Sequence, residues 1–167
     1  HQECNSVSSQ HSVSQLQDSG YETGAERRVI VSLMNVFGVS HSALTAQSGR
    51  LNLIAENLAN AEVQSGEPET AYKGQYPLFR SVLQAQQGDG TGMGVKLEGT
   101  VEDTRPARSS YEPGNPLADD EGFVYLSNVN SVQEMANMMQ ATRSYQTNVE
   151  MMNTAKQLLM RTLTLGQ

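Results

Sequence analysis

Two amphipathic stripes, one in each half of the chain, constrain the fold more than any other sequence feature. Both follow a seven-residue repeat with an intermediate position, a 3–4 rhythm. The first stripe spans residues 36–61, and its apolar members are Phe37, Leu44, Leu51, Ile54 and Leu58. The second spans residues 130–164, and its members include Met135, Met138, Tyr145, Val149, Met152, Leu159 and Leu163. This spacing puts each set on one helix face, so the sequence predicts two long helices.

Neither helix is expected to be stable alone, because an isolated amphipathic helix in water is marginal. The nearest partner is the other helix, and antiparallel packing would give a coiled-coil-like pair. Such a pair leaves much of both helices exposed, so copies of the chain or similar chains are expected to cover them. Asn57 and Asn60 either end the first helix or hydrogen-bond across helices between subunits; the sequence favours neither role.

The segment between the stripes breaks the helical pattern. Residues 62–94 are rich in Gly and Pro, which predicts a loop. Residues 95–127 alternate apolar and polar side chains in places, which predicts a small β element. Pro113-Gly114 is expected at the centre of a type II turn, with a positive φ at Gly114. The predicted fold class is therefore mainly α, with a small β insertion between long terminal helices.

Residues 1–30 differ from the rest of the chain. They are rich in Ser and Gln and poor in apolar residues up to Gly24, which predicts disorder. We interpret this segment as a disordered or non-native extension, with Val31 at the native initiator position. The N-terminal helix is then expected over 31–61 and the C-terminal helix over 128–167.

Composition excludes several classes of function. The net charge of −7 argues against a nucleic-acid partner, and the single cysteine cannot form an internal disulfide. No apolar run approaches the roughly 20 residues of a membrane span. The glycines at 88–94 lack the Gly-Lys-Ser/Thr end of a phosphate-binding loop, and Asp119–Glu121 is interpreted as a solvated turn. No catalytic pairing of residues is visible, so we expect no enzyme activity, cofactor, metal or small-molecule substrate.

Four separated motifs carry a family resemblance. They are GVSHSAL at 38–44, ENLANA at 56–61, YEPGNPLAD at 111–119 and RSYQTNV at 143–149. In this order they resemble the bacterial flagellar rod, hook and hook-associated proteins, over residues 31–167. Because several motifs occur in the right order, the resemblance is more specific than any short pattern. The acidic stretch 62–70 departs from the family, whose members usually carry a more basic segment there.

The resemblance implies a structural subunit of the proximal rod in the flagellar basal body, spanning the periplasm. It further implies export through the flagellar type III apparatus, helical stacking with copies of itself and other rod proteins, transmission of torque, and a place in the export-channel wall. Termini that order only on assembly are also implied. We predict that the stripe residues named above, with Asn57 and Asn60, form the assembly interface. The alternatives are another rod- or hook-class axial protein, or a soluble coiled-coil adaptor that binds a helical partner.

Overall fold

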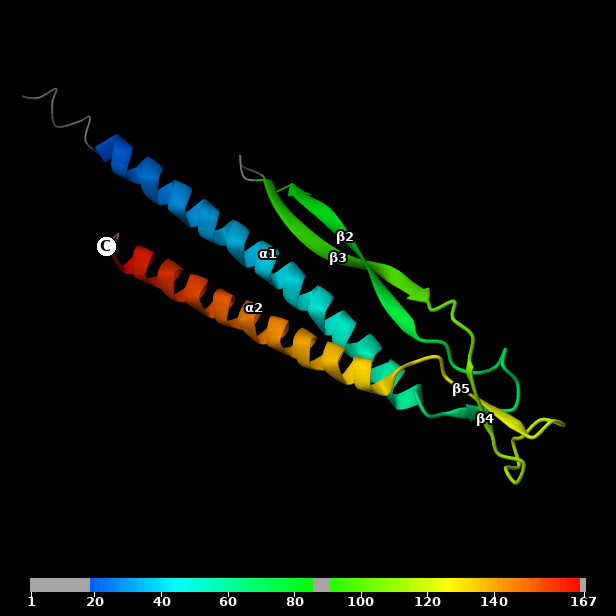
Figure 1. Cartoon of the computed structure of the whole chain (residues 1–167). Coiled ribbons are helices and arrows are strands. Elements are labelled where there is room, and N and C mark those ends of the chain that lie inside the picture. Colours follow the sequence, from blue (N-terminus) through cyan, green and yellow to red (C-terminus); the bar gives the residue numbers. More distant parts are fainter. Residues whose placement is uncertain (1–18, 86–90, 166–167) are drawn as a thin grey trace, which may run out of the picture.

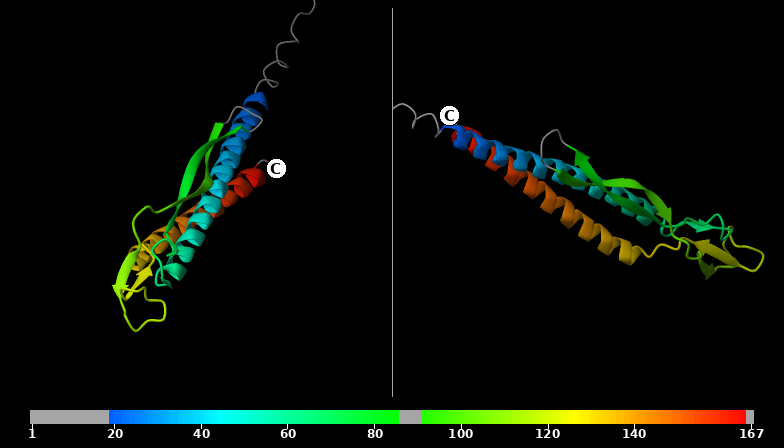
Figure 2. Two further views of the ribbon diagram at one scale, coloured as in Figure 1. Left: turned by 90° about the vertical axis from the view of Figure 1, so that its right-hand side faces the viewer. Right: turned by 90° about the horizontal axis from the view of Figure 1, so that it is seen from above.

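The structure, a computed structural model, describes residues 19–85 and 91–165. Its elements in chain order are α1 (Ser19–Asn60), β1 (Gln64–Ser65), β2 (Gln75–Ala85), β3 (Thr91–Glu102), β4 (Arg108–Tyr111), β5 (Phe123–Leu126) and α2 (Ser131–Leu165). The two helices run antiparallel side by side, the β2–β3 hairpin lies along α1, and a small sheet closes one end (Figures 1 and 2). The predicted fold class, mainly α with a β insertion between terminal helices, is confirmed.

The start of α2 is fixed by a side-chain cap. The Oδ1 atom of Asn130 accepts hydrogen bonds from the backbone N–H groups of Val132 and Gln133, at 3.1 and 3.2 Å. These bonds satisfy two donors that have no partner within the helix. The 35 residues from Ser131 to Leu165 contain neither Gly nor Pro, so the helix continues for about 52 Å.

The N-terminal helix is longer than the sequence predicted. It begins at Ser19 rather than near residue 31, so the prediction of disorder was wrong for residues 19–30; residues 1–18 lie outside the described residues. Residues 25–28 (Ala-Glu-Arg-Arg) contain good helix formers, and residues 19–30 contain no proline, so the helix continues in the N-terminal direction beyond the predicted start. Residues 19–28 are polar, which is why the sequence predicted disorder. A segment can still have a high helix propensity without an apolar face.

Helix α1 also corrects the expectation that no apolar run reaches the length of a membrane span. Residues Gly24–Asn60 contain an 18-residue window with a mean hydropathy of 1.5, sufficient by length and composition to cross a membrane. A helix packed in a protein core passes the same test. In this subunit only 11% of that window is buried, although α1 contacts α2, β2 and β3.

The β2–β3 hairpin replaces most of the predicted loop at 62–94. Its strands pair antiparallel from Gln75↔Glu102 to Ala85↔Thr91, with a register shift at Leu78/Phe79. Glycine permits its close approach to α1: a Cβ atom at Gly49 would lie 2.9 Å from Cδ2 of Leu97. Among the glycines that predicted a flexible loop, Gly92 and Gly94 lie in β3, and a Cβ atom at Gly92 would lie 3.7 Å from Cγ2 of Val39 on α1.

The small sheet has the strand order β1-β5-β4. Its turn at Pro113-Gly114 exists, because the Asn115 N–H donates to the Glu112 carbonyl at 3.0 Å, but it is not type II. Among the described residues, the glycine with a positive φ is Gly122, at 85°. The predicted conformation of Gly114 was therefore wrong, and the left-handed position lies at the other end of the same loop.

Gly122→Ala should destabilise the protein by about 1–3 kcal/mol, because a side chain is strained at positive φ. The added Cβ would also meet Cε2 of Tyr111 at 3.0 Å and Cβ of Pro113 at 3.2 Å. Gly114→Ala is the matched control, since nothing lies within 4 Å of its Cβ position. Urea unfolding of both variants measures the difference, and equal midpoints would contradict the assignment.

Candidate assembly interface

The seam between the helices differs from the predicted stripe on α2. Its buried residues are Glu134, Ala141 and Ala155, spaced by seven and fourteen residues. Half-buried Met138 and Met152, two members of the predicted stripe, lie on the same side of the helix. Met135, one position after Glu134, lies beside the seam instead and is 58% exposed. The small alanine side chains let α1 and α2 approach closely. A prediction based on large apolar residues does not select alanines.

The predicted interface residues fall into three groups by burial. The buried ones are Ile54 and Asn57. The half-buried ones are Phe37, Leu44, Leu51, Leu58, Asn60, Met138, Val149, Met152 and Leu159. The exposed ones are Met135, Tyr145 and Leu163. Only the last two groups retain surface for a partner outside this subunit.

Further exposed apolar side chains, which the stripes did not include, surround these positions. On α1 they are Val29, Val31, Met34 and Val36. On α2 they are Val132, Met139, Met151, Leu158, Met160 and Leu165. The first set lies at the N-terminal part of α1, which is beside the C-terminal part of α2 (Figure 1). Grouped apolar exposure of this kind is typical of a protein–protein contact.

Asn57 has a role that the sequence did not indicate. Its Oδ1 accepts the Gln75 N–H at 2.9 Å and the Tyr72 hydroxyl at 3.0 Å, and its Nδ2 donates to the Gln75 carbonyl at 2.9 Å. One side chain thus binds both backbone groups at the start of β2. This differs from both roles considered for it, whereas Asn60 lies at the last residue of α1 and donates to the Glu56 carbonyl at 2.8 Å.

Two further side chains join the segments where the sheets meet the helices. The Asn128 Oδ1 accepts the Gly74 N–H at 2.8 Å, and its Nδ2 donates to the Arg105 carbonyl at 2.8 Å. Arg108 donates to the carbonyls of Ser127 at 2.8 Å and Ala61 at 3.0 Å. Because the Ala61 carbonyl follows the end of α1, this arginine also caps that helix. The junction is therefore rigidly bonded.

Glu134 is a buried carboxylate in the first turn of α2. It is 3% exposed; its Oε1 accepts from Asn137 Nδ2 at 3.1 Å, while Oε2 has no partner among the described residues. The partial positive charge of the helix N-terminus favours a carboxylate there. Burial is the main cause that raises the pKa of the nearby Tyr72. The negative charges of Glu56 and Glu134 raise it further. This burial could not be predicted from the sequence, because glutamate is normally a surface residue.

The acidic turn at Asp119–Glu121 is used for local structure. Asp119 accepts hydrogen bonds from the backbone N–H groups of Phe123 and Glu121 and from the Tyr125 hydroxyl. The hydrogen bond from the Phe123 N–H is the main reason that the pKa of Asp119 lies below its ordinary value. Within the described ranges, no group of three or more His, Cys, Asp or Glu side chains could hold a metal ion.

Comparison with known proteins identifies relatives along most of the chain. Residues 120–165 match the family described as "Flagellar basal body rod FlgEFG protein C-terminal". The chain is 48% identical over 137 residues to "Flagellar basal-body rod protein FlgC" of Escherichia coli O6:H1, across 82% of this chain and 100% of that protein. The proteins of the same name from Salmonella typhimurium and from Buchnera aphidicola subsp. Acyrthosiphon pisum are 47% and 39% identical, with the same shares covered.

Proposed function

As a member of the FlgC family of flagellar basal-body rod proteins, this chain is a structural subunit of the rod, and we propose that it binds neighbouring rod subunits through the exposed apolar faces of α1 and α2. The observation that carries the proposal is the exposure of large apolar side chains beside the helical seam. Leu163 is 51% exposed and Leu165 is 88% exposed. A contact that buried one such side chain fully would contribute up to about 1.5–3 kcal/mol.

The same proposal assigns the finer roles. Copies of the chain and other rod proteins cover the helix faces, the assembled helices line the export channel and transmit torque, and the flagellar type III apparatus exports the subunit. The N-terminal part of α1 and the C-terminal part of α2 are largely exposed in the subunit, which supports their stabilisation by neighbouring subunits on assembly. A rod of this kind needs a heterologous contact, in which one surface binds a different surface of the next subunit, because such contacts extend into helical assemblies.

Leu163→Glu should reduce incorporation of the chain into basal bodies at least tenfold. The side chain is half exposed in the subunit, so the monomer should lose little stability, but a contact would have to bury a carboxylate. Tenfold corresponds to about 1.4 kcal/mol, less than the cost of burying an unpaired charge. Gln157→Glu, at an exposed polar position of the same helix, is the control.

The measurement is the amount of chain in purified basal bodies, with swimming radius as a second readout. Equal incorporation of the two variants would contradict the proposed interface. A wild-type chain absent from basal bodies and recovered in a discrete complex would instead indicate an adaptor.

A further inference from the structure

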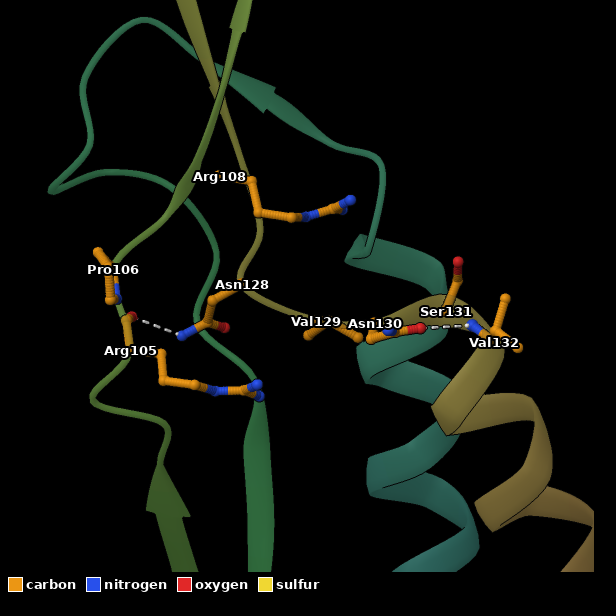
Figure 3. A pocket seen from close by; sticks show the side chains of 8 residues that line it. All are labelled: Arg105, Pro106, Arg108, Asn128, Val129, Asn130, Ser131 and Val132. Carbon is orange, nitrogen blue, oxygen red and sulfur yellow. Dashed lines mark hydrogen bonds between the residues drawn. The ribbon is translucent and has the colours of Figure 1, made fainter.

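A groove of about 570 Å³ lies where the small sheet meets the N-terminal end of α2. Figure 3 shows Arg105, Pro106 and Arg108 on the sheet side of this groove, Asn128 hydrogen-bonded to Arg105, and residues 129–132 leading into α2 on the helix side. The residues come from two segments of the chain, 105–108 and 128–132. The groove is held in shape by the hydrogen bonds of Asn128 and Arg108 described above, so it exists before any partner binds.

The two arginines retain hydrogen-bonding capacity toward a partner. Arg105 uses Nε and Nη2 to bind Asp103, and Nη2 also contacts the Tyr76 hydroxyl at 3.5 Å. Arg108 uses Nε and Nη2 for the backbone carbonyls of Ser127 and Ala61, and its Nη2 also lies 3.6 Å from Oε1 of Glu62, in an ion pair whose glutamate is exposed. Across the described residues neither Nη1 atom donates a hydrogen bond, and both side chains are about half exposed, at 58% and 49%. Guanidinium N–H groups that remain free favour a carboxylate.

Val132 supplies an apolar contact at the same place. It is 75% exposed, although Val129 beside it in the groove is fully buried. Val132, Met135 and Met139 are spaced at i, i+3 and i+7, so they share one helix face. The groove therefore continues onto exposed surface of α2 that the proposed function assigns to subunit contacts. Its location favours a neighbouring subunit over a small free anion.

We propose that this groove receives a segment of a neighbouring rod subunit that presents a carboxylate beside an apolar side chain. The guanidinium groups of Arg105 and Arg108 bind the carboxylate, and the apolar side chain packs on Val132. The positive end of the α2 dipole adds to the attraction. This inference rests on the proposed function and specifies the chemistry of one partner surface.

The test compares Val132→Asp with Val132→Lys in the full chain. Val132 is the second residue of α2, where an acidic side chain stabilises a helix and a basic one destabilises it. The effect on docking is opposite: Asp repels the incoming carboxylate, whereas Lys attracts it and keeps an alkyl stem. The Asp variant should incorporate into basal bodies at least tenfold less than the Lys variant, despite melting at an equal or higher temperature.

Val101→Asp and Val101→Lys are the matched control pair. Val101 is an exposed valine on β3, 52% exposed and away from the groove. It measures the general effect of a charge on incorporation. An Asp-to-Lys ratio at position 132 no larger than the ratio at 101 would overturn the inference.

A photoreactive side chain at position 132 in purified basal bodies gives an independent readout. The crosslinked peptide of the neighbour should contain Asp or Glu next to an apolar residue. A peptide without an acidic residue, or an attached lipid, would refute the assignment. If the wild-type chain is present in basal bodies and the variants at position 132 incorporate equally, only this inference is wrong. If the wild-type chain is absent from basal bodies, the proposed function is wrong.

Discussion

Deleting Leu158–Gln167 is expected to abolish swimming and to remove the chain from purified basal bodies. The deletion takes away four exposed apolar side chains at the C-terminal end of α2: Leu158, Met160, Leu163 and Leu165. It also takes away half-buried Leu159 from the seam. Several apolar contacts of about 1.5–3 kcal/mol each would be lost from every interface, which is enough to prevent assembly.

The same truncation should leave the sheets folded. The small sheet lies at the opposite end of the helix pair, and the hairpin packs on α1 (Figure 1). The Asn57 and Asn128 hydrogen bonds that hold the junction lie far from the deleted segment in the fold. The purified variant should therefore show β signal in circular dichroism and a protease-resistant fragment that contains residues 57–130.

Two controls are needed to attribute the loss of swimming to the loss of assembly. Its level in the cell must match that of the wild-type chain, since a degraded protein would also fail to assemble. Gln157→Glu, next to the deletion, should swim normally. Full swimming by the truncated chain would show that the end of α2 is not needed for assembly, and the terminal-helix interface would have to be abandoned.

The sequence predicted the parts of this fold that depend on local periodicity. The heptads around Leu51 and Met152 predicted two helices and their antiparallel packing. The hairpin of residues 75–102 was largely missed, because its register depends on pairing between Gln75 and Glu102 and on close approach at Gly49. Such contacts join residues distant in the chain, and glycine alone cannot distinguish a loop from a closely packed strand.

The candidate interface was predictable to a similar extent. Met135, Tyr145 and Leu163 were selected as large apolar residues at helical spacing, and the structure leaves them exposed. Val132 could not be selected, because it lies off the repeat and acquires its setting from Arg105 and Arg108. Sequence spacing identifies a face of a helix; it does not specify which part of that face the rest of the subunit covers.

Asn57→Asp should destabilise the subunit by about 3–5 kcal/mol at neutral pH. Asn57 is 1% exposed, and its Nδ2 donates to the Gln75 carbonyl. A carboxylate would place an acceptor against that carbonyl and would bury a charge without a cation. Its other oxygen could still accept hydrogen bonds from the Gln75 N–H and the Tyr72 hydroxyl. The carboxylate would therefore attract the N–H group of Gln75 and repel its carbonyl.

The pH dependence distinguishes this mechanism from a simple loss of packing. Burial and the facing Gln75 carbonyl both raise the pKa of the introduced carboxyl above its unfolded value of about 4. The protonated form can donate to that carbonyl, so the deficit relative to wild type should be smallest below pH ~4. It should grow as the pH rises toward the raised folded pKa, and then stay constant.

Asn60→Asp is the matched control, one turn nearer the end of the same helix. Its Nδ2 makes only an exposed bond to the Glu56 carbonyl, so the loss should stay within about 1 kcal/mol, mostly from a negative charge at a helix C-terminus. Urea unfolding from pH 4 to pH 8 measures both variants.

Because Asn57 holds the start of β2 to α1, its substitution should also release the hairpin and expose it to protease. A pH-independent deficit equal to that of Asn60→Asp would show that the Asn57 amide does not secure this junction.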